Sequence, residues 1–191
     1  VQSGSGAEGV KLLRAALKIN PRSAACRLNL GNALLEAKEP REAAKLFREL
    51  LASGPVSEAA VRGLAQALND AGQAAEARQA AERGLAQFPK SVQLLNELGR
   101  TQVATAAPQL AAETYRRALA LSPGYTAAAL NLGNALTELK AFEEAEQVLR
   151  QVLAREPRNV QALTNLAHMH RSNWQAGKAI EAAQAALGIA P

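Results

Sequence analysis

The amino-acid sequence predicts an all-α protein, because of its composition and because of a repeat that runs through the chain. Apolar residues make up 48% of the 191 residues, but aromatic residues only 3%, and much of the apolar content is alanine. Alanine is the best helix former and the smallest side chain that still buries apolar surface. Sheets favour β-branched and aromatic residues instead. We therefore expect closely packed helices.

A proline recurs at intervals of 34 residues without an insertion or a deletion. These prolines are Pro21, Pro55, Pro89, Pro123, Pro157 and Pro191. A leucine followed by a small residue keeps the same interval, at Leu30, Leu64, Leu98, Leu132 and Leu166. An alanine follows each of these leucines 13 residues later, at Ala43, Ala77, Ala111, Ala145 and Ala179. A fixed period of this length is typical of stacked structural repeats.

Turn residues divide each unit into two helices. Gly72 comes where a first helix should end, and glycine is common just after a helix C-terminus. Pro40 and Pro108 come where a second helix should begin, a place where the missing N–H costs nothing. The recurring prolines then end the second helices. The sequence therefore predicts antiparallel helix pairs that stack one after another.

A unit of 34 residues with an early Leu-Gly, a central Ala and a closing Pro resembles the tetratricopeptide repeat. The match is best in the units at 24–57, 92–125 and 126–159 and weaker in the other two. The resemblance implies a right-handed α-solenoid, a superhelix of about 11 helices. The expected organisation is a flexible lead-in at 1–6, the second helix of a partial repeat at 7–23, and five repeats at 24–57, 58–91, 92–125, 126–159 and 160–191.

Both ends of the chain suggest that the repeats are part of something larger. The sequence begins with a valine rather than a methionine, and no polar capping helix follows Pro191. A solenoid normally needs a cap, because each helix pair buries only one face against its neighbour. We expect the natural protein to continue past these ends. A homo-oligomer, in which a second copy covers the uncapped end, is the alternative.

Charge and composition limit the classes of partner. The net charge of +5 arises from 22 Lys and Arg against 17 Asp and Glu, and the basic residues are scattered. No block of five or six cations is present, so we expect no nucleic-acid partner. No apolar run reaches 18 residues, so we expect no membrane insertion. The single cysteine, Cys26, excludes an intrachain disulfide and fits a cytoplasmic location, with a periplasmic one left open.

Nothing in the sequence has the spacing of a catalytic or metal site. A G-x-G-x-x-G pattern at residues 4–9 lacks the preceding strand that dinucleotide binding requires. His168 and His170 point in different directions on one helix and cannot share a metal ion. We expect Trp174 to cover the end of the last hairpin. The sequence predicts no enzyme activity, no cofactor and no metal site in this chain.

The resemblance implies a concave groove lined by the first helices, and polar residues flank the recurring leucine there. An amide offers both a donor and an acceptor, so a row of them can pair with the backbone of an extended peptide. This arrangement resembles the asparagine ladder in the tetratricopeptide region of O-linked N-acetylglucosamine transferases, although Gly63 and Glu97 interrupt it. Polar side chains that merely face solvent are the alternative. The candidate peptide-binding residues are Asn29, Asn32, Gln66, Arg100, Asn131, Asn134, Asn165 and His168.

The function that we favour is a protein-interaction scaffold that binds an extended peptide or a partner helix in this groove. A targeting or regulatory arm of a larger, transferase-type enzyme and a self-assembling structural module are the alternatives. The groove positions lack the Lys-Asn-Asn-Lys-Arg set with which related repeats grip the acidic tails of chaperones. Their charges are of both signs, so the groove demands neither a strongly acidic nor a strongly basic ligand.

Overall fold

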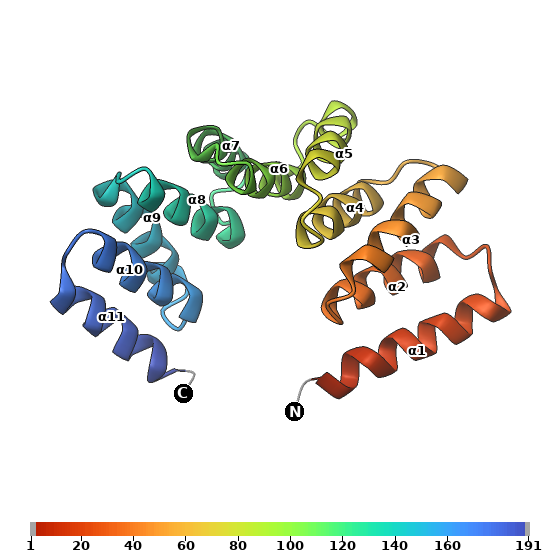
Figure 1. Cartoon of the computed structure of the whole chain (residues 1–191), viewed down its shortest axis with the longest axis horizontal. Helices are drawn as coiled ribbons and strands as arrows, with labels where there is room; N and C mark the ends of the chain where they lie inside the picture. Colours follow the sequence, from red (N-terminus) through yellow and green to blue (C-terminus); the bar gives the residue numbers. More distant parts are fainter. Residues whose placement is uncertain (1–2, 190–191) are drawn as a thin grey trace. The chain divides into compact units, whose positions relative to one another are not determined.

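The computed structural model describes residues 3–189, and these residues form eleven α-helices and no strand (Figure 1). The prediction of an all-α chain is therefore confirmed. The chain divides into two compact units, Val1–Thr101 and Gln102–Pro191.

The first unit holds five helices and most of a sixth. Their bounds are α1 Ser3–Ile19, α2 Ala24–Glu36, α3 Pro40–Ser53, α4 Glu58–Asp70, α5 Ala74–Gln87 and α6 Val92–Ala104. Helix α1 begins at Ser3, so residues 3–6 are helical and the expected lead-in there is wrong. Adding residues to an existing helix costs far less than starting one, which lets the helix extend over glycine and serine. The expected lead-in at residues 1–2 lies outside the described part.

The second unit holds the end of α6 and the remaining helices. These are α7 Pro108–Leu121, α8 Thr126–Glu138, α9 Phe142–Arg155, α10 Val160–Ser172 and α11 Ala176–Leu187. The even-numbered helices α2 to α10, called first helices below, each span 13 residues and begin at the first residue of a 34-residue unit. The odd-numbered helices are called second helices.

Within each unit, helices that follow one another in the chain pack side by side. The contacts run from α1 through α5 in the first unit and from α7 through α11 in the second. First helices also contact the next first helix, as α2 contacts α4 and α8 contacts α10. Helices α2, α4, α8 and α10 thus contact both second helices and another first helix, which is the packing expected of stacked helix pairs.

Small residues at the helix crossings explain the repeated Leu-Gly and Ala. The Phe47 ring lies between two first helices, because a Cβ on Gly31 would lie 2.5 Å from its Cζ and a Cβ on Gly63 would overlap the same atom. In the second unit, a Cβ on Gly133 would lie 2.7 Å from a Leu149 methyl group. The recurring alanines at 43, 77, 111 and 145 are fully buried. Larger residues at these positions would force the helices apart.

Two residues after the end of every first helix, one residue adopts the left-handed conformation. These residues are Lys38, Gly72, Ala106, Lys140 and Trp174, with φ between 56° and 73°. The next residue then donates its N–H to a carbonyl near the end of the helix, as Gln73 does to Leu68 at 2.8 Å. The helix end expected at Gly72 is confirmed.

Trp174 does not cover the last hairpin, contrary to our expectation. Its side chain is 94% exposed. A left-handed residue lies at the outer tip of the turn, where the chain reverses, and its side chain extends into solvent instead of folding back on the helices.

We expect Gly31→Ala to destabilise the first unit by about 1–3 kcal/mol, the usual cost of overpacking. The new methyl group would overlap the Phe47 ring, and Gly63 on its other side stops the ring from moving away. Gly9→Ala is the matched control, because no atom lies within 4 Å of the added Cβ. It should leave stability unchanged or raise it slightly. Chemical unfolding followed by circular dichroism measures both, and equal stabilities would contradict the prediction.

We expect Trp174→Gly to stabilise the second unit by about 1 kcal/mol, because glycine adopts a positive φ without the steric cost that other residues meet. The exposed indole contributes almost no burial that could be lost. Trp174→Ala keeps the strained backbone and should leave the stability close to that of the parent protein. Equal unfolding midpoints for the glycine and alanine variants would show that the turn is not strained.

Candidate functional site

The candidate residues on α2 and α8 lie on sides of these helices that differ from the side packed against the following second helix. Gly31 of α2 faces Phe47 of α3. At about 100° per residue, Asn29 lies nearly opposite Gly31 on that helix, and Asn32 lies about a quarter of a turn away from Gly31. In the second unit, Gly133 faces Leu149 in the same way, and Asn131 and Asn134 lie away from it. The 34-residue repeat therefore places amides at the same two positions of a first helix in each unit, away from the glycine that packs on the following second helix.

Five of the candidate side chains are free to bond a ligand. None of them forms a side-chain hydrogen bond with another residue in the range 3–189. They are Asn29, Asn32 and Gln66 in the first unit and Asn134 and His168 in the second. Asn29 and His168 are exposed, and the other three are half-buried, as is Asn131. A half-buried amide is held in place by its neighbours yet still reaches the surface. This combination suits the recognition of a backbone.

Asn165 is engaged inside the second unit. It is only 5% exposed, and its Nδ2 donates to the Leu130 carbonyl at 3.3 Å. Its Oδ1 accepts from Gln161 Nε2 at 2.9 Å. The side chain thus connects α10 to α8, and a ligand would have to displace these bonds to reach it.

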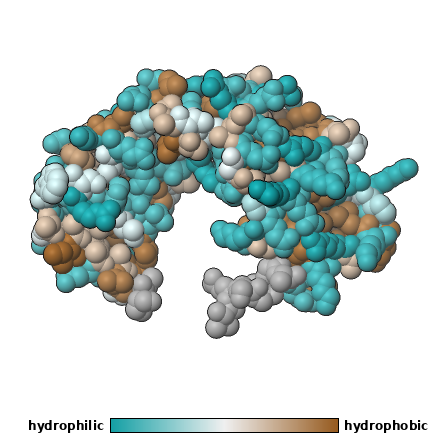
Figure 2. All heavy atoms as spheres, in the orientation of Figure 1, coloured by the Kyte–Doolittle hydropathy of each residue, from teal (hydrophilic) through white to brown (hydrophobic). Residues whose placement is uncertain are grey.

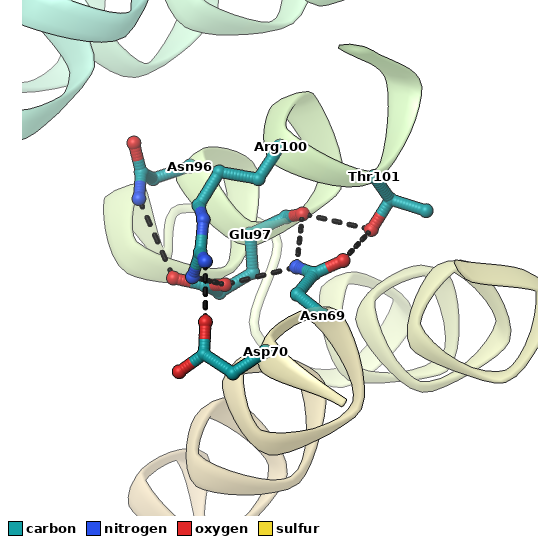
Figure 3. Close-up of polar contacts among 6 residues, drawn as sticks. All are labelled: Asn69, Asp70, Asn96, Glu97, Arg100 and Thr101. Carbon is teal, nitrogen blue, oxygen red and sulfur yellow. Dashed lines mark hydrogen bonds and ion pairs between the residues drawn. The ribbon is translucent and has the colours of Figure 1, made fainter. Parts of the chain in front are cut away.

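Arg100 belongs to a polar network between α4 and α6 (Figure 3). Its Nη1 lies 2.8 Å from Glu97 Oε2 and its Nη2 lies 2.5 Å from Asp70 Oδ1. The Glu97 side chain is 9% exposed, so the guanidinium neutralises a nearly buried carboxylate. Burial by itself would lower the pKa of Arg100, but Glu97 and Asp70 outweigh that effect and raise it above its ordinary value.

Asn69 and Thr101 complete this network, which we call the α4–α6 network. Asn69 Nδ2 donates to the Glu97 carbonyl at 2.9 Å and to its Oε2 at 3.0 Å. The Thr101 hydroxyl, which is fully buried, donates to Asn69 Oδ1 at 2.7 Å. Asn96 Nδ2 donates a longer bond to Glu97 Oε1 at 3.4 Å. The donors and acceptors of these groups are largely satisfied within the protein, so Arg100 is not a free cation.

The sequence analysis missed Asn69 and Thr101, although a signal was present. One repeat away from Asn69 the chain has Leu35 and Val103, and one repeat away from Thr101 it has Ala67 and Ala135. Two positions thus change from apolar to polar where Glu97 and Arg100 also depart from the pattern. Linked departures of this kind indicate a local polar cluster.

The sequence profile of the family described as tetratricopeptide repeat matches residues 1–68, 35–99 and 103–167, which is most of the chain. The chain belongs to the tetratricopeptide repeat family. Proteins of this family are typically non-enzymatic scaffolds that bind protein or peptide partners. Within the described residues of this tetratricopeptide protein, no helix is long and apolar enough to cross a membrane.

Solved tetratricopeptide structures share this fold over most of the chain. YrrB, described as a tetratricopeptide protein with an unusual peptide-binding site, is 23% identical, with a TM-score of 0.64 over 94% of this chain and 92% of its own. TTC0263, a thermophilic protein of Thermus thermophilus, is also 23% identical, with a TM-score of 0.80 over 88% and 92%. A tetratricopeptide repeat protein of Parabacteroides merdae is 15% identical, with a TM-score of 0.78 over 98% and 75%. No curated protein matches the sequence. At these identities, the likeness shows the fold alone.

We expect Arg100→Ala to destabilise the first unit by about 1–3 kcal/mol, because it leaves the Glu97 carboxylate nearly buried without its cation. A double variant replaces both Glu97 and Arg100 by asparagine, the residue found at the matching positions 131 and 134. It should lower the free energy of unfolding by less than Arg100→Ala alone. The double variant removes the charge and the need to neutralise it. Chemical unfolding of the two variants is the measurement, and a double variant that costs as much as or more than Arg100→Ala would contradict the prediction.

Proposed function

We propose that this tetratricopeptide protein binds extended peptides on the free faces of its first helices, through hydrogen bonds from side-chain amides to the peptide backbone. The proposal rests on four amides that have no side-chain partner among residues 3–189. They are Asn29, Asn32 and Gln66 in the first unit and Asn134 in the second.

Amides suit a backbone ligand because each offers an acceptor oxygen and two donor hydrogens. An extended peptide presents N–H and C=O groups in alternation, whatever its side chains are. Asn29 and Asn32 are three residues apart on α2, so both lie along the same face of that helix. Gln66 is the equivalent of Asn32 one repeat further on. A peptide that crosses α2 and α4 within the first unit would therefore meet several amides in succession.

Internal bonding removes two of the eight candidates from peptide contact. Arg100 and Asn165 hold neighbouring first helices together. We therefore assign peptide contact to the five candidates without a side-chain bond among residues 3–189. We add Asn131, which has an interaction of its own, only because it is the repeat equivalent of Asn29. Because the charge of Arg100 is balanced by Asp70 and Glu97, ligand binding should depend little on acidic side chains in the peptide.

The proposal is tested on an array of extended peptides of mixed sequence, probed with the parent protein and with a variant in which Asn29, Asn32, Asn131 and Asn134 are all alanine. We expect the variant to lose most of the bound peptides irrespective of their sequence, because each lost amide removes hydrogen bonds to backbone groups, worth about 0.5–1.5 kcal/mol apiece.

The matched control replaces two exposed amides of the second helix α9, Gln147→Ala and Gln151→Ala. It should retain binding to the same peptides, since these residues lie outside the first helices. Circular dichroism verifies that both variants fold. A parent protein that binds no peptide, or a fourfold variant that binds as the parent does, would refute backbone recognition by these residues.

A further inference from the structure

The outer side of the first unit has an apolar cleft that the proposed peptide contacts do not use. The cleft has a volume of about 400 Å³ and lies between the second helices α3 and α5, with α4 beneath them. Val61, Leu64 and Leu68 of α4 contribute to its lining, together with Leu51 of α3 and Ala80 of α5. Apolar atoms gather between α3 and α5 in the right half of the space-filling view (Figure 2).

The cleft and the proposed peptide contacts lie on different sides of α4. Gln66 is two residues from both Leu64 and Leu68, and two residues correspond to about 200° around a helix. The amide therefore points away from the leucines that line the cleft. A ligand in the cleft would meet a surface that the backbone-binding amides do not reach.

Small side chains on α5 create the cleft. At the positions where α3 has Leu46, Phe47 and Leu50, the next repeat has Ala80, Ala81 and Gly84. Gly84 brings the backbone close to α4, since a Cβ there would lie 2.6 Å from Val61 Cγ1 and 2.9 Å from Leu94 Cδ1. Ala80 remains partly exposed. The side chain that would cover Leu64, which is half-buried, is missing in this repeat.

The rim of the cleft has one positive charge that no described residue neutralises. Arg48 Nη2 lies 2.5 Å from Glu76 Oε2, so these two charges compensate each other. Arg83 also lines the cleft and is exposed, and it forms no ion pair or hydrogen bond with any residue between 3 and 189. The neighbouring polar side chains of Gln79 and Gln87 are uncharged. An apolar floor with a net positive rim complements an apolar group that has an acidic neighbour.

We propose that this cleft is a second docking site, which takes one or two bulky apolar side chains of a partner peptide while an adjacent acidic side chain of that peptide pairs with Arg83. The volume lies in the range of ordinary ligand pockets. Large apolar residues that fill such pockets, surrounded by a polar rim, supply most of the binding energy at protein interfaces. This site lies on a different face of α4 from the proposed peptide contacts. It also recognises side chains of the partner, whereas those contacts recognise its backbone.

The test begins with selection from a displayed library of random peptides, each about twelve residues long, on the intact protein. We expect enrichment of sequences with Leu, Phe or Trp beside Asp or Glu. The affinity of an enriched peptide is then measured by fluorescence anisotropy for the parent protein and for four variants.

Ala80→Leu fills the cleft with the residue that the preceding repeat has at the same position, Leu46, and should weaken binding about tenfold or more. Arg83→Glu reverses the exposed charge and should weaken binding roughly fivefold at low salt, and less as the salt concentration rises. Arg83 is exposed and has no partner among the described residues, so its substitution tests the site even if Ala80→Leu disturbs the packing.

Two controls separate this site from the proposed peptide contacts. Arg117→Glu reverses the equivalent arginine one repeat further on and should leave affinity unchanged. Asn29→Ala combined with Asn32→Ala should also leave it unchanged, even if those residues bind other peptides. The proposal is overturned if no apolar and acidic pattern is enriched. It is equally overturned if the enriched peptides bind the Ala80→Leu and Arg83→Glu variants as they bind the parent, or lose affinity only in the asparagine variant.

Discussion

The close approach of first and second helices governs which surfaces of this protein remain available for binding. The Phe47 ring is held between Gly31 and Gly63, and Leu149 packs on Gly133 at a distance that leaves no room for a methyl group. Because these crossings fix how each first helix is rotated, equivalent residues of the repeats point in the same direction from their helices. The positions of the amides follow from this rotation and not from any contact that the amides make.

These equivalent positions are used in two ways. Asn29, Asn32 and Asn134 have no side-chain partner within residues 3–189, whereas Asn165 and the α4–α6 network join neighbouring first helices. Polar residues that are buried must find partners, and burial here depends on what the next repeat presents. The ability to bind a ligand and the stability of the stack therefore compete for the same positions, and the outcome differs from one repeat to the next.

The outer cleft follows from the same close approach. In most repeats, a large residue of the second helix fills the space above the first helices, as Phe47, Tyr115 and Leu149 do with exposures of at most 1%. The repeat at 58–91 has Ala81 instead, together with the small residues Ala80 and Gly84. A repeat that departs from its family pattern thus keeps its helices together by backbone proximity and leaves apolar surface open on the other side.

The fold class, the 34-residue frame and the helix end at Gly72 could all be predicted from the sequence, because they depend on local propensity and on residues that recur in every unit. Periodicity also placed the candidate residues on the first helices. It could not show that Asn165 is buried against Leu130, that Asn69 and Thr101 bond to Glu97, or that Trp174 points into solvent. Those features depend on packing between helices, since whether a polar group is buried, and what it bonds to, is set by residues about 30 positions away that lie on a neighbouring helix.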